Sequence, residues 1–258
     1  MKKPPSPIAY RQNSGFKKGK IIMFLVFDVD DTMYDLMWPF QMAFENILAE
    51  KTTVSCEELF RQSRICSDIV LEKEKQGLIP SEEAFFRRMQ MTCEAKGFAI
   101  TREESEAFER EYRDCQTKIR LFDYMKEVLD YCREHQIPRA VLTNGSRKSQ
   151  GRKLEVLQLE RWFDDENVFI SGEVGYHKPD VRVFQHVQEK MAIQSEDAWY
   201  IGDTYENDIV GAHQAGWHSI WLNHRNRPCP DEISLADIEL KNKEELLPTI
   251  QRLIRKAD

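Results

Sequence analysis

The sequence lacks the features that mark several broad classes of protein. None of its apolar stretches is long enough to span a membrane, so we expect no membrane partner. Its start, which contains lysine and proline, has no apolar segment of the kind that a secretory signal requires. The net charge of −7 argues against a general nucleic-acid-binding face, and we expect no nucleic-acid polymer as a partner.

Cysteine is sparse and scattered along the chain. The six cysteines include no CxxC pair, which argues against a zinc site and against a disulfide framework. They stand at Cys56, Cys66, Cys93, Cys115, Cys132 and Cys229. This usage is typical of a reducing compartment, and it predicts a cytoplasmic protein.

The composition that remains fits a globular fold. Hydrophobic residues make up 41% of the chain and charged residues 31%, and 258 residues suffice for one large domain or for a domain with an insert. Residues 1–20 combine lysine, proline and glycine in a way that packs poorly, and we expect a loose tail there.

One short stretch combines an apolar run with a group of acidic residues. The apolar run over residues 21–27 predicts a strand that is buried on both faces, as in a parallel sheet. It stops at Asp28, Asp30 and Asp31, and Thr32 follows. Asp28 and Asp30 face the same side if the chain stays extended. Two carboxylates in one crevice repel each other and need a cation or a proton, although an acidic turn after a strand is also common.

The next part of the chain has helical periodicity. Residues 34–118 predict about four helices without an intervening strand, which makes an all-helical insert. Helix starts are indicated at Ser55, Pro80 and Thr101, and helix ends at Gly77 and Gly97.

Strand and helix patterns alternate after residue 121. Strands are predicted over 139–143, 168–170, 199–201 and 219–222, and helices over 123–135, 149–159, 180–190, 207–215 and 243–255. This alternation predicts an α/β fold, in which helices cover both faces of a Rossmann-like parallel sheet. We therefore expect a core formed by residues 21–33 and 119–258, with the helical insert over 34–118.

Chemically suggestive residues stand at three later strand ends. Thr143-Asn144-Gly145 can hold an anion, and Lys178-Pro179 and the pair Asp203 and Asp208 follow further along. Each has a simpler explanation on its own: a turn, an exposed lysine or a helix N-terminus. Ligands bind at the carboxyl ends of strands in open α/β sheets, so their joint occurrence there favours a common site.

These four motifs together resemble those of the haloacid dehalogenase-like hydrolase superfamily. They are Asp28-Val29-Asp30-Asp31-Thr32, Leu142-Thr143-Asn144-Gly145, Lys178-Pro179 and the stretch GDTYENDIVGAHQAG from Gly202 to Gly216. The resemblance covers about residues 21–225, and it implies that the helical insert is an α-helical cap. Asp31 stands where many members have glycine, which is similar to the nucleotidase and sugar-phosphatase branches.

The resemblance also implies a role for each motif residue. Asp28 would be the nucleophile that forms an aspartyl-phosphate, and Asp30 the general acid and base, a role that suits a carboxyl whose pKa is raised by a like-charged neighbour. Mg²⁺ would be held by the Asp28 carboxylate, the Asp30 backbone carbonyl and Asp203. The remaining roles are phosphate binding by Thr143, the Asn144 amide and Lys178, orientation of Lys178 or of metal-bound water by Asp208, and support of the Asp30 loop by Thr32.

Several alternative activities stay open on the same scaffold. A haloacid dehalogenase needs the nucleophile but neither a second acid nor a metal, so Asp30 and Asp203 favour phosphoryl transfer. A phosphonate-cleaving enzyme needs a Schiff-base lysine in the cap, and nothing distinguishes Lys51, Lys73 or Lys75. A sugar-phosphate phosphatase and a phosphosugar mutase use the same acid pair. A non-catalytic binding protein would normally have lost a motif residue, and this chain has lost none.

The expected substrate is a small phosphorylated metabolite. Cap residues would read its leaving group, and a nucleoside 5′-monophosphate is favoured because its base could stack on an aromatic ring. Trp38, close after the nucleophile strand, is the preferred contact. The other candidates are Tyr34, Asp35, Phe40, Phe85 and Phe86, most of which also fit a helical core.

Overall fold

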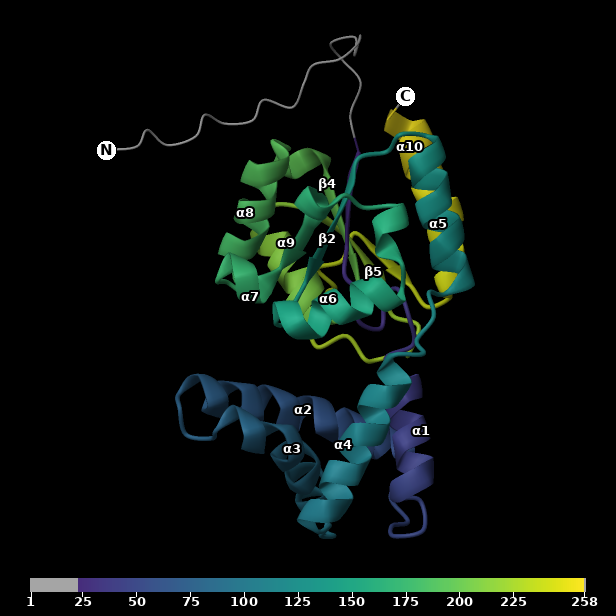
Figure 1. Cartoon of the computed structure of the whole chain (residues 1–258). Coiled ribbons are helices and arrows are strands. Elements are labelled where there is room, and N and C mark those ends of the chain that lie inside the picture. Colours follow the sequence, from purple (N-terminus) through teal and green to yellow (C-terminus); the bar gives the residue numbers. More distant parts are fainter. Residues whose placement is uncertain (1–22, 258) are drawn as a thin grey trace, which may run out of the picture.

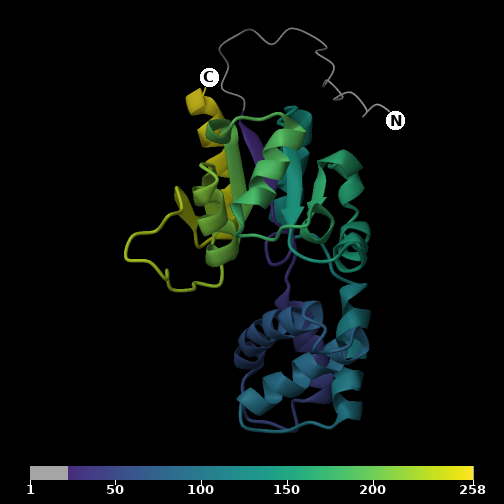
Figure 2. The same cartoon turned by 90° about the vertical axis from the view of Figure 1, so that its left-hand side faces the viewer.

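The computed structural model describes residues 23–257. The tail expected over residues 1–20 and the start of the strand expected over 21–27 lie outside the described residues. Figure 1 shows a sheet flanked by helices, with a separate group of helices below it. The view in Figure 2, turned by a quarter, keeps the same two parts.

The sheet has six strands, all of them parallel. The strands are β1 (Phe24–Phe27), β2 (Arg139–Thr143), β3 (Val168–Ile170), β4 (Ala198–Gly202), β5 (His218–Leu222) and β6 (Ile238–Leu240). Their order is β3-β2-β1-β4-β5-β6. The chain thus builds outward from β1 in both directions, and this reversal of strand order opens a crevice at the carboxyl ends of β1, β2 and β4.

Strand β1 is buried on both faces. Leu25 and Phe27 belong to one apolar cluster, whereas Phe24 and Val26 belong to another on the opposite face. Helices α5 (Asp123–Glu134) and α10 (Leu246–Ala257) contribute to the first cluster, and α8 (Val181–Met191) and α9 (Val210–Gln214) to the second. The predicted Rossmann-like sheet with helices on both faces is confirmed.

The lower group consists of four helices inserted between β1 and α5. They are α1 (Met37–Ile47), α2 (Cys56–Lys75), α3 (Ser81–Ala95) and α4 (Arg102–Gln116). Both predicted capping boxes are present, because the Ser55 and Thr101 hydroxyls accept from backbone N–H groups of Glu58 and Glu104. The helical cap is confirmed, while its expected limits at residues 34 and 118 stay a prediction.

The structure departs from the predicted elements at several points. The short helix α7 (Ser171–Val174) was not predicted, and two further differences concern β6 and α9. Strand β6 was not predicted, because three residues at a sheet edge carry too short a pattern to be read. The helix expected over 207–215 begins with a π turn, Tyr205–Ile209, before α9. Such turns re-aim side chains inside a helix, and this one carries Asp208.

Two short helices complete the core. They are α6 (Arg147–Val156), which follows β2, and α7 (Ser171–Val174), which follows β3. Within residues 23–257, no helix combines the length and the apolar composition needed to cross a membrane.

Candidate active site

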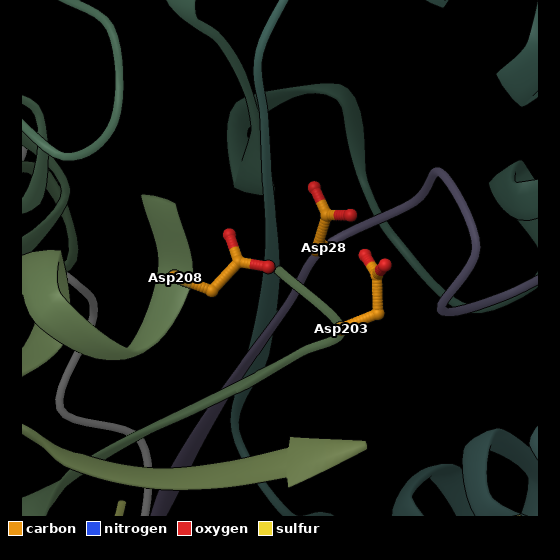
Figure 3. Close-up of side chains that lie close together, drawn as sticks. All are labelled: Asp28, Asp203 and Asp208. Atoms are coloured by element: carbon orange, nitrogen blue, oxygen red, sulfur yellow. The ribbon is translucent and has the colours of Figure 1, made fainter. Parts of the chain in front are cut away.

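Three buried carboxylates converge at the carboxyl ends of β1 and β4. Asp28 follows β1, Asp203 follows β4, and Asp208 lies in the π turn, and each offers an oxygen within 4.8 Å of the others'. Figure 3 shows Asp208 beside the pair formed by Asp28 and Asp203. Because β1 pairs directly with β4, residues far apart in the sequence meet here.

Glycine is required at the end of β4 by the close approach of Asp208. A Cβ atom on Gly202 would collide with the Asp208 carboxylate. That carboxylate turns back to the chain, where its Oδ2 accepts from the Thr204 N–H at 3.0 Å. The sequence pattern Gly202-Asp203 followed by Asp208 therefore has a steric reason.

Lys178 joins this cluster through its ammonium group. Its Nζ donates to Asp28 Oδ1 at 2.7 Å, to Asp208 Oδ1 at 2.7 Å and to the Tyr200 hydroxyl at 2.6 Å. Burial by itself would lower the pKa of Lys178, but Asp208 and Asp28 outweigh it and hold the pKa well above its usual range. The lysine is therefore positively charged, and Asp208 holds its ammonium group by a hydrogen bond.

Asn144 holds the Lys178 segment in place. Its side-chain Nδ2 donates to the Lys178 carbonyl at 2.9 Å, and its Oδ1 accepts from the Lys178 N–H at 2.9 Å. The Nδ2 group carries a second hydrogen besides the one that Lys178 accepts, and phosphate binding by the Asn144 amide stays a prediction.

Thr143 lies at the cavity with its side chain buried. The residue ends β2, lines the same cavity as Asp28 and is only 1% exposed. Within the described part of the chain, its buried Oγ1 has no hydrogen-bond partner. A buried hydroxyl without a partner is costly, and a bound oxyanion would satisfy it.

The carboxylate cluster carries more negative charge than its surroundings balance. Burial raises the pKa of Asp28 to about 7, although Lys178 lowers it, and Asp208 and Asp30 raise it further. Burial and repulsion from Asp31 also raise the pKa of Asp203 well above its usual value. Crowded, buried oxygen donors of this kind fit a hard divalent cation such as Mg²⁺.

Asp30 lies beside the cluster in a different environment. Lys153 Nζ lies 2.6 Å from both of its carboxylate oxygens, and the Tyr34 hydroxyl donates to Oδ1 at 2.7 Å. Burial would raise the pKa of Asp30, but Lys153 and Tyr34 together lower it to about 2. The expectation of a pKa raised by a like-charged neighbour is therefore wrong for Asp30, because the Lys153 ammonium of α6 contacts its carboxylate directly.

Asp31 and Thr32 occupy the turn that follows Asp30. Asp31 has a positive φ of 61° and is held by Arg225, which contacts both of its carboxylate oxygens and also Asp35. Thr32 is fully buried, and its carbonyl accepts from the Tyr124 hydroxyl at 2.6 Å. These contacts tie the turn to Arg225 and to Tyr124 of α5, while support of the Asp30 loop by Thr32 stays a prediction.

Sequence reasoning missed the cations that follow β5. Arg225 binds Asp31, and Arg227 donates to Asp203 Oδ2 at 3.0 Å. Both arginines follow the carboxyl end of β5, which lies at the same edge of the sheet as the other strand ends. Their position after a strand is the signal in the sequence that indicates them.

A cavity of about 680 Å³ lies between the core and the cap. Asp28, Asp30, Lys178 and Asp203 line it on the core side, and α2, α3 and α4 contribute the cap side. This volume is within the usual range for a small-molecule site.

Trp38, the preferred substrate contact, is not among the described residues that line the cavity. Its side chain is partly buried and packs on the apolar core. Phe40 and Phe86 are buried in the cap, Tyr34 bonds Asp30, and Asp35 accepts from the first N–H groups of α1. The side chain of Phe85 lies outside the description. The structure thus brings the motif residues together, and among the described aromatic candidates Tyr34 contacts one of them.

The fold and the site together define a Rossmann-like core with a helical cap over a carboxylate site. The sequence profile of haloacid dehalogenase-like hydrolases matches residues 25–222. The chain belongs to this family, which confirms the resemblance drawn from the motifs.

Individual relatives are similar over different shares of the chain. A phosphoserine phosphatase of Thermus thermophilus is 35% identical over 133 residues, which is 52% of this chain and 51% of that protein. The chain thus spans about half the length of this relative. A glyceraldehyde 3-phosphate phosphatase of Methanopyrus kandleri is 24% identical over 91% of this chain and 100% of its own. The fold matches YfnB of Bacillus subtilis in its magnesium-bound crystal structure, with a TM-score of 0.64, 23% identity and coverage of 88% of this chain and 98% of that one.

Proposed function

We propose that the chain is a Mg²⁺-dependent phosphomonoester hydrolase that acts on a small phosphorylated metabolite. The observation that carries this proposal is the contact of Lys178 Nζ with Asp28 Oδ1 and Asp208 Oδ1. These residues lie beside Asp203 at the core wall of the cavity. The names of the related phosphatases support the same class of reaction.

The residues divide the reaction into two steps. Asp28 attacks phosphorus, so that a phosphorus–oxygen bond to Asp28 forms while the bond to the leaving oxygen breaks. Asp30, once it has separated from Lys153 and taken up a proton from solvent, gives that proton to the leaving oxygen. Asp30 then takes a proton from water, which attacks phosphorus, breaks the bond to Asp28 and releases inorganic phosphate.

Charge at the phosphoryl group is balanced by the residues around it. Lys178 and the Thr143 hydroxyl would hold the phosphoryl oxygens, whose charge builds up in the transition state. Asp28, Asp203 and the Asp30 carbonyl would hold Mg²⁺, which supplies additional positive charge when bound.

Hydrolysis of p-nitrophenyl phosphate with and without Mg²⁺ tests the reaction class. We expect turnover that needs Mg²⁺ and stops when EDTA is added. Metal-independent release of halide from 2-chloropropionate would instead support the dehalogenase alternative. Absence of both activities would support a non-catalytic binding protein.

The choice of substrate is a separate part of the proposal. The sequence favours a nucleoside 5′-monophosphate, but Trp38 does not line the cavity, and sugar phosphates also fit its volume. A panel of nucleotides and sugar phosphates, assayed with Mg²⁺, distinguishes these classes. Activity confined to sugar phosphates contradicts the nucleotide preference.

A further inference from the structure

The cap wall of the cavity carries more positive than negative charge. Among the described residues that line this wall, four arginines stand against two carboxylates. They are Arg61, Arg64, Arg88, Arg113, Asp68 and Glu109, and they come from α2, α3 and α4, the helices below the core in Figure 1. A phosphate group bound by the core motifs lies on the opposite wall, so this charge faces the leaving group.

One of the four arginines is neutralised within the cap. Arg88 forms an ion pair with Glu109 at 2.6 Å, with both side chains largely buried, and it lies 4.9 Å from the centre of the Tyr112 ring. This pair is part of the cap structure, and among the described residues of the cap wall Glu109 is the one buried carboxylate. Glu109 also acts on the charge of Arg113, whereas no effect of Glu109 on Arg64 is seen.

Arg64 is the most suggestive of the remaining three. Its side chain is partly buried, yet within residues 23–257 it has no hydrogen-bond or ion-pair partner. Its charge is close enough to lower the pKa values of Asp30 and Tyr34, which places it toward the catalytic carboxylates. A partly buried guanidinium at a cavity wall is stabilised by an anion that binds it.

Arg113 adds a second positive charge at the same wall. Burial lowers its pKa, Glu109 opposes this effect, and Arg152 and Arg88 lower the pKa further by smaller amounts. Cations are thus crowded around this part of the cavity, and a bound anion would relieve their repulsion.

The aromatic rings of this wall already pack against other side chains of the protein. Tyr112 has Arg88 over its ring and stacks on Phe108. Phe60 packs edge-on against Phe40, and the Arg225 guanidinium lies 5.8 Å from the centre of the Phe60 ring. A nucleoside leaving group is uncharged and needs a free ring for stacking. The wall is therefore suited to charge and not to a base.

We propose that Arg64 and Arg113 form a subsite for a second anionic group, so that the preferred substrates are phosphomonoesters whose leaving group carries a carboxylate or another phosphate. This inference rests on the proposed phosphatase function. It names the class of substrate within it.

Matched substrates test the subsite. 3-Phosphoglycerate and glycerol 3-phosphate differ only in a carboxylate that replaces a hydroxymethyl group. We expect kcat/KM to be at least about tenfold higher for 3-phosphoglycerate, in line with a charge-assisted hydrogen bond. Glucose 1,6-bisphosphate and glucose 6-phosphate form a second pair, which shows whether phosphate is accepted in place of carboxylate.

Variants link the preference to the named residues. Arg64→Gln should reduce the ratio of the two kcat/KM values toward one, mainly through a higher KM for the charged ester. The ratio cancels any effect of Arg64 on the chemistry at Asp30. Arg64→Lys should restore part of the ratio, and Arg110→Gln, on an exposed part of α4 outside the cavity, should leave it unchanged.

The outcomes separate this inference from the function on which it rests. Turnover of p-nitrophenyl phosphate with Mg²⁺, but without preference in either pair, overturns the subsite and leaves the phosphatase. A preference that Arg64→Gln and Arg113→Gln both leave intact also overturns it. No turnover of any ester overturns both proposals together.

Discussion

Lys153 Nζ lies 2.6 Å from both carboxylate oxygens of Asp30, and this contact ties α6 to the turn after β1. The two residues are 123 positions apart in the sequence. Lys153 is only 6% exposed, so water screens the pair weakly. While the pair is intact, Asp30 is ionised at neutral pH and suited to take a proton from water. To donate a proton, it must first separate from Lys153.

Loss of the Lys153 ammonium should destabilise the metal-free protein in a pH-dependent manner. The folded-state pKa of Asp30, about 2, is below its ordinary value of 3.8. The pair therefore stabilises the fold above pH 4, and this stability is lost as the pH falls toward 2. Lys153→Met should lower the free energy of unfolding by about 2 kcal/mol at pH 7 and by about half as much at pH 3.

Urea unfolding in EDTA at the two pH values measures this effect. Lys148→Met is the control, because Lys148 is exposed on the same helix. An equal loss of stability at pH 7 and pH 3 would mean that Lys153 acts through packing alone.

Substitution of the nucleophile should separate activity from folding. Asp28→Asn keeps the shape of the side chain, and burial already disfavours the charged form of Asp28. The fold should therefore survive, while hydrolysis of p-nitrophenyl phosphate falls by roughly 10⁴-fold or more. Initial rates and circular dichroism check the two parts. Rates close to those of the wild type would show that Asp28 does not attack phosphorus.

Metal binding should depend on Asp203. Removal of its charge by Asp203→Asn takes one ligand from the buried cluster, so the affinity for Mg²⁺ should fall roughly tenfold or more. Calorimetric titration of the protein with Mg²⁺ alone measures the affinity directly. Asp68→Asn, at the exposed cap side of the cavity, should have no effect. Unchanged affinity in Asp203→Asn would exclude this carboxylate as a ligand.

The pair formed by Asp31 and Arg225 should be important for stability. Arg225→Met would leave the Asp31 carboxylate, which is 1% exposed, without its main partner, and the expected cost is about 3 kcal/mol. The double variant with Asp31→Asn should recover part of that loss, since no buried charge then stays unpaired. Denaturant unfolding of the four proteins in a double-mutant cycle measures the coupling. Strictly additive losses would contradict it.

Two buried cysteines should resist alkylation at pH 8. Burial raises the pKa of Cys93 and of Cys132 to about 12, so only about one molecule in 10⁴ carries either thiolate at that pH. Mass spectrometry after iodoacetamide treatment should find both unmodified in the native protein and modified in urea. Rapid labelling under native conditions would show that these parts of the fold open readily.

Local features of the sequence were sufficient to predict most of the framework. The capping boxes at Ser55 and Thr101 follow from contacts among residues close in the chain. The apolar runs of β1, β2 and β4 could be recognised as buried strands from their local pattern. Strand β6 was missed because three residues, Ile238–Leu240, become a strand only when β5 is already in place beside them.

The sequence alone determined which residues stand at the strand ends, because a parallel sheet must bring its strand ends to one edge. Only the tertiary structure decided which cation meets which carboxylate: Lys178 meets Asp28, Lys153 meets Asp30, and Arg225 meets Asp31. The physical reason is that charge effects depend on distance and on removal from water. Both are set by the packing of segments that lie more than a hundred residues apart.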